Sequence, residues 1–233
     1  ATLPATLASL LEANQRGLIR EVIISDGGSD DLTRDIAEEA GARVVVGPKG
    51  RGQQLIRGAE LARGKWLLFL HADTQLSPDW AGAAETHIED AYDRKAAVFR
   101  LAFEAKGIKP RLVALGANLR TRLVRLPYGD QGLLISRQHY DRLGGYCNFP
   151  LFEDVELIRR LVKEGGRRAL CPLEVMALTS PERYVQEGYV LRVLRNARLL
   201  SAFFAGTPTE ELAERYDARR KRRIRKASAS HGQ

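Results

Sequence analysis

The chain has 233 residues, of which 44% are hydrophobic and 28% charged. This composition excludes a disordered or fibrous protein and fits one globular α/β domain with or without an appendage. The net charge of +8 is concentrated in the run from Arg215 to Lys226, which holds eight Lys or Arg and one Asp, so the rest of the chain is nearly neutral.

The cysteines and the apolar runs bear on the cellular compartment. Cys147 and Cys171 are too far apart for a CxxC motif, and two cysteines do not make a disulfide framework. No apolar run approaches the roughly 20 residues that a membrane span needs, and the N-terminus has no basic region followed by an apolar one. We therefore expect a cytoplasmic protein with reduced, buried thiols.

The first half of the chain alternates helices and apolar strands. The spacing of the leucines predicts an amphipathic helix at residues 3–11, before any strand. Short apolar runs then predict strands at 21–25, 43–46 and 66–70, the first two followed by a turn and a helix. This alternation indicates an α/β fold with a mostly parallel, Rossmann-like central sheet covered by helices on both faces. Such sheets bind ligands at the carboxyl ends of their strands.

The second half is less regular. We predict helices at 78–92, 110–125 and 154–164, and strands at 97–103, 132–136 and 168–178. Two C-terminal helices, at 185–204 and 209–222, complete the prediction. Because the chain has no internal repeat and no clear linker, we expect one domain over residues 1–207, followed by a C-terminal helix and basic tail over residues 208–233.

Three acidic groups stand at predicted strand ends or helix starts: Asp26, Asp73, and the pair Glu153 and Asp154. Each alone has a structural explanation as a turn residue, a helix cap or a charge at the positive end of a helix dipole. Together they stand where parallel strands end at one edge of the sheet, and carboxylates gathered there would bind a metal ion and its diphosphate ligand. Both interpretations stay open at this point.

Five motifs occur in an order that is specific as a set, although each is weak alone. They are Asp26-Gly27-Gly28-Ser29-Asp30-Asp31-Leu32-Thr33, Gly50-Arg51-Gly52-Gln53-Gln54, Leu68-Phe69-Leu70-His71-Ala72-Asp73-Thr74, Tyr128-Gly129-Asp130-Gln131-Gly132 and Phe152-Glu153-Asp154-Val155-Glu156-Leu157. Through these motifs the chain, from Ala1 to Tyr216, resembles the inverting family-2 glycosyltransferases of GT-A fold. The resemblance is greatest to the small bacterial members described as selenodomain-associated or arsenosugar-type transferases.

The resemblance implies a role for each acid. Asp26, with Gly27 beside it, matches the acid that hydrogen-bonds the nucleobase of a nucleotide-sugar, a task that suits an acceptor-only carboxylate. Asp73 matches the last acid of a DxD-type motif, which holds Mg²⁺ or Mn²⁺ against the diphosphate of the donor. Asp154 matches the base that takes a proton from the acceptor hydroxyl, and Glu153 would position the acceptor or Asp154 itself.

The same resemblance points to four further residues. His71 stands where many relatives carry the first acid of the metal motif, so it faces the ribose, the metal or only its neighbours in the fold. Asp130 matches an acceptor-side or donor-sugar loop residue, and Arg183 matches an arginine near the diphosphate. The basic loop that holds Arg51 would contact phosphate through guanidinium and backbone N–H groups. For these residues a turn, packing or solvated surface role is the competing interpretation.

One departure from the family concerns the start of the chain. Members open on an apolar strand that supplies nucleotide contacts before their first helix. Here the sequence begins at that helix, so we expect the family's first strand to be missing and the nucleobase pocket to be incomplete.

The leading hypothesis is a metal-dependent inverting glycosyltransferase that uses a UDP- or GDP-type sugar donor and a small or lipid-like hydroxyl acceptor. The first alternative is a sugar-phosphate nucleotidyltransferase, whose Gly-rich loop would directly follow its first strand. The second is a non-catalytic module that binds a polyanion or a membrane through the basic run. The aromatic content of 7%, without a stacking platform, disfavours nucleic acid as a partner. The run from Arg215 to Lys226 would instead bring the enzyme to the inner face of an anionic membrane.

Overall fold

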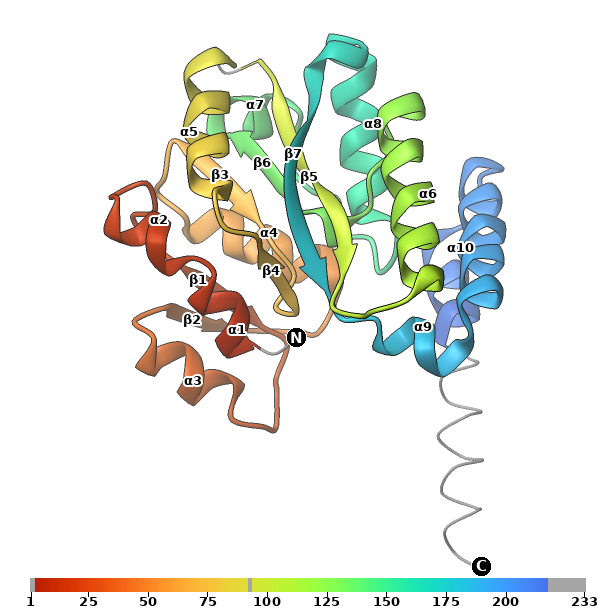
Figure 1. The fold of residues 1–233 in the computed structure, drawn as a ribbon, viewed down its shortest axis with the longest axis horizontal. Helices are drawn as coiled ribbons and strands as arrows, with labels where there is room; N and C mark the ends of the chain where they lie inside the picture. The colour runs from red at the N-terminus through yellow and green to blue at the C-terminus, as the bar shows by residue number, and fades with distance from the viewer. Residues whose placement is uncertain (1–2, 92–93, 218–233) are drawn as a thin grey trace, which may run out of the picture.

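The computed structural model describes residues 3–91 and 94–217, in which strands and helices form the expected α/β fold (Figure 1). The strands are β1 (Ile23–Asp26), β2 (Arg43–Val46), β3 (Trp66–Phe69), β4 (Thr74–Leu76), β5 (Ala96–Phe103), β6 (Leu133–Ser136) and β7 (Leu170–Thr179). The helices are α1 (Leu3–Ala8), α2 (Leu11–Gln15), α3 (Thr33–Glu39), α4 (Arg51–Leu61), α5 (Trp80–Asp90), α6 (Ile108–Val124), α7 (Arg137–Arg142), α8 (Glu153–Gly165), α9 (Glu182–Glu187) and α10 (Tyr189–Phe204). Two 3-10 turns, η1 (Gly129–Gln131) and η2 (Arg167–Ala169), and helical residues 209–217 complete the described chain.

The larger sheet has five strands in the order β3-β6-β5-β7-β4. Only β5 and β7 pair in parallel; the pairs β3–β6, β5–β6 and β4–β7 are antiparallel. The expectation of a mostly parallel sheet is therefore wrong for this sheet. An apolar run shows that a strand is buried on both faces, as β6 is at all four positions. Burial on both faces is typical of parallel strands, but a central antiparallel strand such as β6 has the same pattern.

The smaller sheet is the parallel pair of β1 and β2, with Asp26 opposite Val46 at its carboxyl end. Helix α4 packs on β1, and its Gln54 side chain joins the two: Nε2 donates to the Ser25 carbonyl at 2.8 Å, and Oε1 accepts from the Gly50 N–H at 3.3 Å. This bridge fixes the loop before α4 against the end of β1.

The expected helix at 185–204 is two helices, α9 and α10. Gly188 between them has a φ of 85°, a left-handed conformation that interrupts the helical backbone and that glycine adopts without strain. A small strand, β4, was not predicted, because its three residues are too few for a period-2 pattern.

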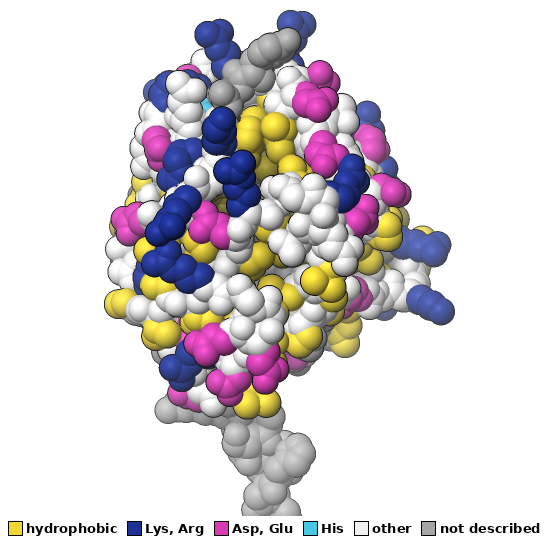
Figure 2. Space-filling view, turned by 90° about the vertical axis from the view of Figure 1, so that its left-hand side faces the viewer, with side chains coloured by type: hydrophobic (Ala, Val, Ile, Leu, Met, Phe, Trp, Pro, Cys, Tyr) yellow, Lys and Arg dark blue, Asp and Glu magenta, His cyan; other side chains and the backbone are white. Residues whose placement is uncertain are grey.

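The surface of the described residues carries charges of both signs. Figure 2 shows the side of the molecule that lies to the left in Figure 1, where basic and acidic side chains are interspersed with small apolar areas. This pattern agrees with a folded body that is nearly neutral. Most of the basic run, residues 218–226, lies outside the described residues.

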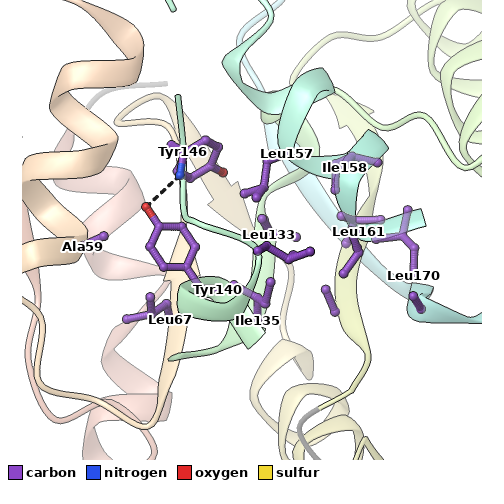
Figure 3. Packing of buried hydrophobic residues seen from close by; sticks show 14 residues of the cluster. Ala59, Leu67, Leu133, Ile135, Tyr140, Tyr146, Leu157, Ile158, Leu161 and Leu170 are labelled. Atoms are coloured by element: carbon purple, nitrogen blue, oxygen red, sulfur yellow. Dashed lines mark hydrogen bonds between the residues drawn. The ribbon is translucent and has the colours of Figure 1, made fainter. Parts of the chain in front are cut away.

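The main core lies between the large sheet and α8 (Figure 3). The predicted apolar face of α8 is confirmed: Val155, Ile158 and Leu161 are at most 3% exposed. Each such side chain contributes about 1.5–3 kcal/mol when fully buried. Beside them the Tyr140 hydroxyl accepts a hydrogen bond from the Tyr146 N–H at 3.0 Å, as drawn in Figure 3. The core thus fixes α8, whose first turn carries the acidic pair.

The described part of the C-terminal segment, residues 209–217, packs on the body. Leu212 is fully buried in a cluster with Phe152, Val155 and Leu199. The boundary between residues 207 and 208 stays a prediction. Cys147 and Cys171 are free thiols, as expected, but half-buried instead of buried. None of the helices in the described ranges is long and apolar enough to cross a membrane.

Candidate active site

His71 and Asp73 lie in the turn between β3 and β4. The turn is closed by a hydrogen bond from the Thr74 N–H to the His71 carbonyl at 3.1 Å, and Thr74 is fully buried. Both candidate side chains are half-buried. The sequence predicted this position, because an apolar strand that stops abruptly leaves its polar residues at the sheet edge.

Glu153 and Asp154 open α8, where the free N–H groups and the helix dipole favour negative charge. The preceding Phe152 has a φ of 64°, a region that non-glycine residues rarely occupy. Its ring packs on Phe203 with the centroids 5.1 Å apart, and it shares a cluster with Leu212. Packing therefore holds a strained residue directly before the acidic pair.

Asp154 is fixed by backbone donors on both oxygens. Its Oδ2 accepts from the Gly129 N–H at 2.5 Å, and its Oδ1 accepts from the Val155 N–H at 2.7 Å. A Cβ at position 129 would lie 2.7 Å from His71 Nε2 and 3.2 Å from Asp154 Oδ2. The imidazole and the carboxylate thus approach the same point of η1, and only glycine leaves room for both.

Glu153 and Asp154 line a cavity of about 20 Å³, which is enough for one water molecule. His71, Tyr128, Gly129 and Tyr146 also line it. The Oε2 atom of Glu153 is buried without a hydrogen-bond partner among the described residues, and the residue is 1% exposed. The side chain therefore presents a free acceptor, or a donor when protonated, inside the site.

Arg51, the first residue of α4, faces the acidic pair. Its Nε lies 3.8 Å from Oε1 of Glu153. Burial lowers the pKa of the guanidinium, but the negative charges of Glu153, Asp154 and Asp130 more than offset that effect, so the pKa is raised and the charge is secured. The Arg51 side chain as a whole is 38% exposed, so a ligand can reach it.

The site shifts several pKa values. Burial, reinforced by the charge of Asp154, raises the pKa of Glu153 to about 7. Burial also raises the pKa of Asp130 to about 6, and its Oδ1 is buried without a partner in the described chain. Burial and the nearby Arg51 lower the pKa of His71 to about 4, so the imidazole is neutral at pH 7. Perturbed groups gathered in one place are typical of functional sites.

Residues of the C-terminal half complete one side of the site. The charge of Arg183 acts on both His71 and Tyr216, and its Nη1 lies 3.4 Å from the Tyr216 hydroxyl. Burial raises the pKa of Tyr216, but Arg192, Arg183 and Arg51 more than offset this, and the pKa is lowered. Tyr216 also accepts a hydrogen bond from Arg192. Residues 209–217 therefore bring a phenol to the edge of the site.

Asp26 and Gly27 lie apart from this group, at the end of β1. Asp26 is 4% exposed, and its carboxylate accepts from the Ser29 hydroxyl at 2.6 Å and from the Ser29 and Gly28 N–H groups. These bonds, the Ser29 hydroxyl first, lower its pKa despite burial. A Cβ at Gly27 would lie 3.2 Å from the Lys49 Cα, so Gly27 allows the loop before α4 to approach. Asp26 thus closes the turn after β1, and its nucleobase role stays a prediction.

The structure brings most of the predicted residues together and adds others. Arg51, His71, Asp73, Asp130, Glu153, Asp154 and Arg183 influence one another electrostatically. Gly129, Tyr146 and Tyr216 were not predicted as site residues. The signal for Gly129 was its place in a motif, whereas a tyrosine at the edge of a site has no local signature.

No cluster of three or more His, Cys, Asp or Glu that could by itself hold a metal ion occurs in the described ranges. Mg²⁺ and similar hard cations are commonly bound by one or two carboxylates together with substrate phosphates. Asp73 is close enough to influence His71 and Asp130 electrostatically. It fits a metal site of this kind, in which one protein carboxylate and the phosphate oxygens of the donor bind the ion together.

The family is decided by sequence comparison. The model of glycosyl transferase family 2 matches residues 1–130, more than half of the chain. The chain belongs to glycosyl transferase family 2. This membership confirms the family and favours glycosyl transfer over nucleotidyl transfer. The finer resemblance to selenodomain-associated or arsenosugar-type members stays a prediction.

Relatives of this family-2 chain share part of its length. It is 41% identical over 83 residues to the PGL/p-HBAD biosynthesis glycosyltransferases of Mycobacterium tuberculosis and Mycobacterium bovis. The match covers 33% of this chain and 32% of each relative, so it spans about a third of their length.

Solved structures confirm the fold of this family-2 chain. Mannosyl-3-phosphoglycerate synthase from Rubrobacter xylanophilus has a TM-score of 0.55 at 19% identity, covering 88% of this chain and 71% of that one. Glucosyl-3-phosphoglycerate synthase from Mycobacterium tuberculosis, in complex with Mn²⁺, UDP-glucose and phosphoglyceric acid, has a TM-score of 0.54 at 20% identity, covering 77% and 67%. At these identities the likeness concerns the fold, which is the expected GT-A type.

Proposed function

We propose that this family-2 protein transfers a sugar from a nucleoside diphosphate sugar to a hydroxyl acceptor, with inversion at the anomeric carbon. The observation that carries the proposal is the Asp154 carboxylate, which opens α8 beside the cavity and approaches the same point as His71. Arg51 and Glu153 beside it are groups that can bind phosphate and position a hydroxyl.

Asp154 acts as the general base. Each of its oxygens accepts one backbone N–H, which leaves a lone pair on each for the acceptor hydroxyl. The carboxylate takes the hydroxyl proton as the acceptor oxygen bonds to the anomeric carbon, while the bond to the diphosphate oxygen breaks and its electron pair leaves with the nucleoside diphosphate. Attack opposite the leaving group inverts the configuration.

The neighbouring residues bind and orient the substrates. Glu153, with its raised pKa and free Oε2, hydrogen-bonds the acceptor. Arg51 and the exposed Arg183 contact the diphosphate, and Asp130 lies on the side of the sugar or the acceptor. Asp26 and Gly27 receive the nucleobase, whose N–H would share the Asp26 carboxylate with the Ser29 and Gly28 donors of the turn.

Asp73 would hold Mg²⁺ or Mn²⁺ together with the diphosphate of the donor. Such an ion stabilises negative charge on the leaving diphosphate. The solved neighbour complex contains Mn²⁺ and UDP-glucose, which supports a UDP-type donor, and a GDP-type donor is the alternative. His71 is neutral, and it orients the ribose or the phosphate oxygens.

The acceptor is a small or lipid-like hydroxyl compound. Phosphoglyceric acid in the neighbour complex is a small acceptor-type molecule. We place the enzyme in the cytoplasm, with the basic run from Arg215 to Lys226 in contact with an anionic membrane surface.

The test separates donor binding from transfer. A thermal-shift screen of UDP-, GDP- and dTDP-sugars with Mn²⁺ first identifies a donor that raises the melting temperature. With that donor, we expect Asp154→Asn to bind within about threefold of wild type while nucleoside diphosphate release with acceptor falls by about 10²–10⁴-fold. Asp141→Asn, at an exposed aspartate of α7, is the matched control. Transfer at the wild-type rate in Asp154→Asn would refute the base.

The metal role of Asp73 is tested with the same donor. We expect Asp73→Ala to weaken donor binding at least about tenfold in Mn²⁺ and to leave the weak binding in a chelator unchanged. Equal affinity of wild type and variant in Mn²⁺ would refute the role. Release of pyrophosphate from a nucleoside triphosphate and a sugar phosphate would instead identify a nucleotidyltransferase.

A further inference from the structure

Helix α6 exposes its large apolar side chains to solvent and buries its small ones, the reverse of the usual pattern in a surface helix. The residues that face the core are small or polar: Pro110, Ala114, Ala117 and Thr121. The outward residues are 52–66% exposed: Ile108, Leu112, Leu115, Leu119 and Leu123. Their spacing of i, i+4, i+7, i+11 and i+15 places them in one stripe, opposite the buried one. The fold therefore exposes a continuous row of aliphatic side chains about 22 Å long.

Positive charges border this stripe. Lys109, Arg111 and Arg122 are exposed on α6, and the helix contains no Asp or Glu. By helical periodicity, Arg111 and Arg122 lie on one side of the stripe and Lys109 on the other. Arg167 adds a further cation at the C-terminal end, where it donates to the Leu123 carbonyl at 2.6 Å.

Helix α10 contacts α6 (Figure 1). Its exposed residues include Val190, Leu194 and Arg198, and it too contains no Asp or Glu. The side of the molecule in Figure 2 differs, since acidic and basic side chains alternate there. We call these parts together the α6–α10 surface: Ile108, Lys109, Arg111, Leu112, Leu115, Leu119, Arg122, Leu123, Val190, Leu194 and Arg198.

We infer that the α6–α10 surface docks on an anionic lipid bilayer, with α6 lying in the plane of the interface. An aliphatic stripe between rows of Lys and Arg is the pattern of helices that bury their apolar face at the headgroup boundary. Anionic headgroups would neutralise the flanking cations. The inference concerns the folded body; it depends neither on the proposed reaction nor on the basic run.

A second copy of the chain fits this surface less well. A two-fold interface brings the same patch of both subunits together, so the cations of α6 would face those of its copy. Neither α6 nor α10 offers a carboxylate to compensate, and like charges brought together in an interface are repulsive. The charge pattern therefore favours a polyanionic lipid surface.

The test uses the full chain and vesicles of phosphatidylcholine with and without about 30% phosphatidylglycerol. We expect binding to the anionic vesicles that falls at about 0.5 M salt. Leu112→Gln, Leu115→Gln and Leu119→Gln combined should weaken it at least about tenfold, because the apolar contact is lost. The matched control combines Leu11→Gln and Leu32→Gln, which change exposed leucines away from α6 (57% and 66% exposed) and should stay within about twofold of wild type.

A second variant tests the electrostatic part. Lys109→Gln, Arg111→Gln and Arg122→Gln combined should reduce the preference for anionic over neutral vesicles at least about fivefold. Vesicle binding unchanged by the leucine variant would overturn the inference. So would a wild-type dimer in light scattering that the leucine variant converts to a monomer, because the surface would then be a subunit interface. Circular dichroism and the urea midpoint confirm that each variant is folded.

Discussion

Asp26 and Glu153 are both buried carboxylates, but their surroundings move their pKa values in opposite directions. Asp26 accepts hydrogen bonds from Ser29 and Gly28 that favour the charged form. Burial and the charge of Asp154 oppose the ionisation of Glu153, and they outweigh the partly exposed Arg51 and a hydrogen bond from the backbone of Glu153, which favour it. Two acids with the same chemistry thus differ in what they can do at pH 7: one is a fixed acceptor, whereas the other exchanges a proton.

The proton on Glu153 makes the stability of the protein depend on pH. Between its ordinary pKa of 4.5 and about 7, the folded protein binds more proton than the unfolded chain, so the free energy of unfolding falls as the pH rises through this window. Glu153→Gln has no carboxyl group to ionise at this position, so its free energy of unfolding should not fall in this way as the pH rises. Relative to wild type, the variant should gain up to about 3 kcal/mol between about pH 4.5 and pH 8.

Urea unfolding of both proteins at several pH values measures this gain. Glu38→Gln, at an exposed position of α3, is the control for removing a carboxylate. A difference between Glu153→Gln and wild type that is the same at both ends of the pH range would contradict the raised pKa.

Part of the site was predictable at the residue scale, and the reason is the position of its acids. Asp73 and Asp154 stand directly after an apolar strand and at the start of an amphipathic helix, which the sequence shows. Gly129 was different, because its importance comes from the close approach of His71, in the turn after β3, and of Asp154, in α8. Such a contact between distant segments leaves no pattern in the local sequence.

At the scale of elements, α4 is positioned by a close approach of its backbone to the loop before α8. The Gly52 N–H donates to the Phe149 carbonyl at 3.2 Å, and a Cβ on Gly52 would lie 2.4 Å from the Cys147 carbonyl oxygen. Backbone atoms cannot move aside as a flexible side chain can. The contact sets where Arg51, one residue earlier, meets Glu153.

Gly52→Ala should therefore destabilise the protein by about 1–3 kcal/mol, as overpacking does. The same helix provides a control of opposite sign. A Cβ on Gly58 would lie 3.8 Å from the Ser25 Cβ, an ordinary contact, so Gly58→Ala should stabilise by up to about 1 kcal/mol through helix propensity. Urea unfolding of both variants measures the two changes. A neutral Gly52→Ala would mean that α4 is not seated on this loop.

The elements themselves were largely predictable, whereas their arrangement was not. Strands β3, β5 and β6 are apolar runs, and α8 has a helical period, so each is visible in the sequence. Whether β6 runs parallel or antiparallel to its neighbours depends on connections through α6 and η1, and the break between α9 and α10 depends on the backbone of Gly188. Long-range packing decides the direction of β6, and the φ angle of one residue decides the break between the two helices.

At the scale of the whole molecule, the two ends of the described chain lie on different parts of the fold (Figure 1). Residues 209–217 at the C-terminal end pack beside α8 and α10. Leu212 is fully buried against Phe152, the strained residue that precedes Glu153. Tyr216, four residues later, lies near Arg51 and Arg183. The segment thus packs against Phe152, which holds the start of α8 and its acidic pair in place, and it adds the Tyr216 phenol to the site.

Leu212→Ala tests whether this segment is part of the cooperative body. Loss of a fully buried leucine costs about 2–5 kcal/mol where the surroundings cannot collapse, so we expect a fall of that size in the free energy of unfolding. We also expect glycosyl transfer to fall at least about tenfold under conditions where the variant is folded, because Phe152 and Tyr216 lose their support. Glu210→Ala, at an exposed neighbouring position, should change both by little. A loss of stability below about 1 kcal/mol would mean that the body folds independently of residues 209–217, which is the outcome that a domain boundary at 207 and 208 requires.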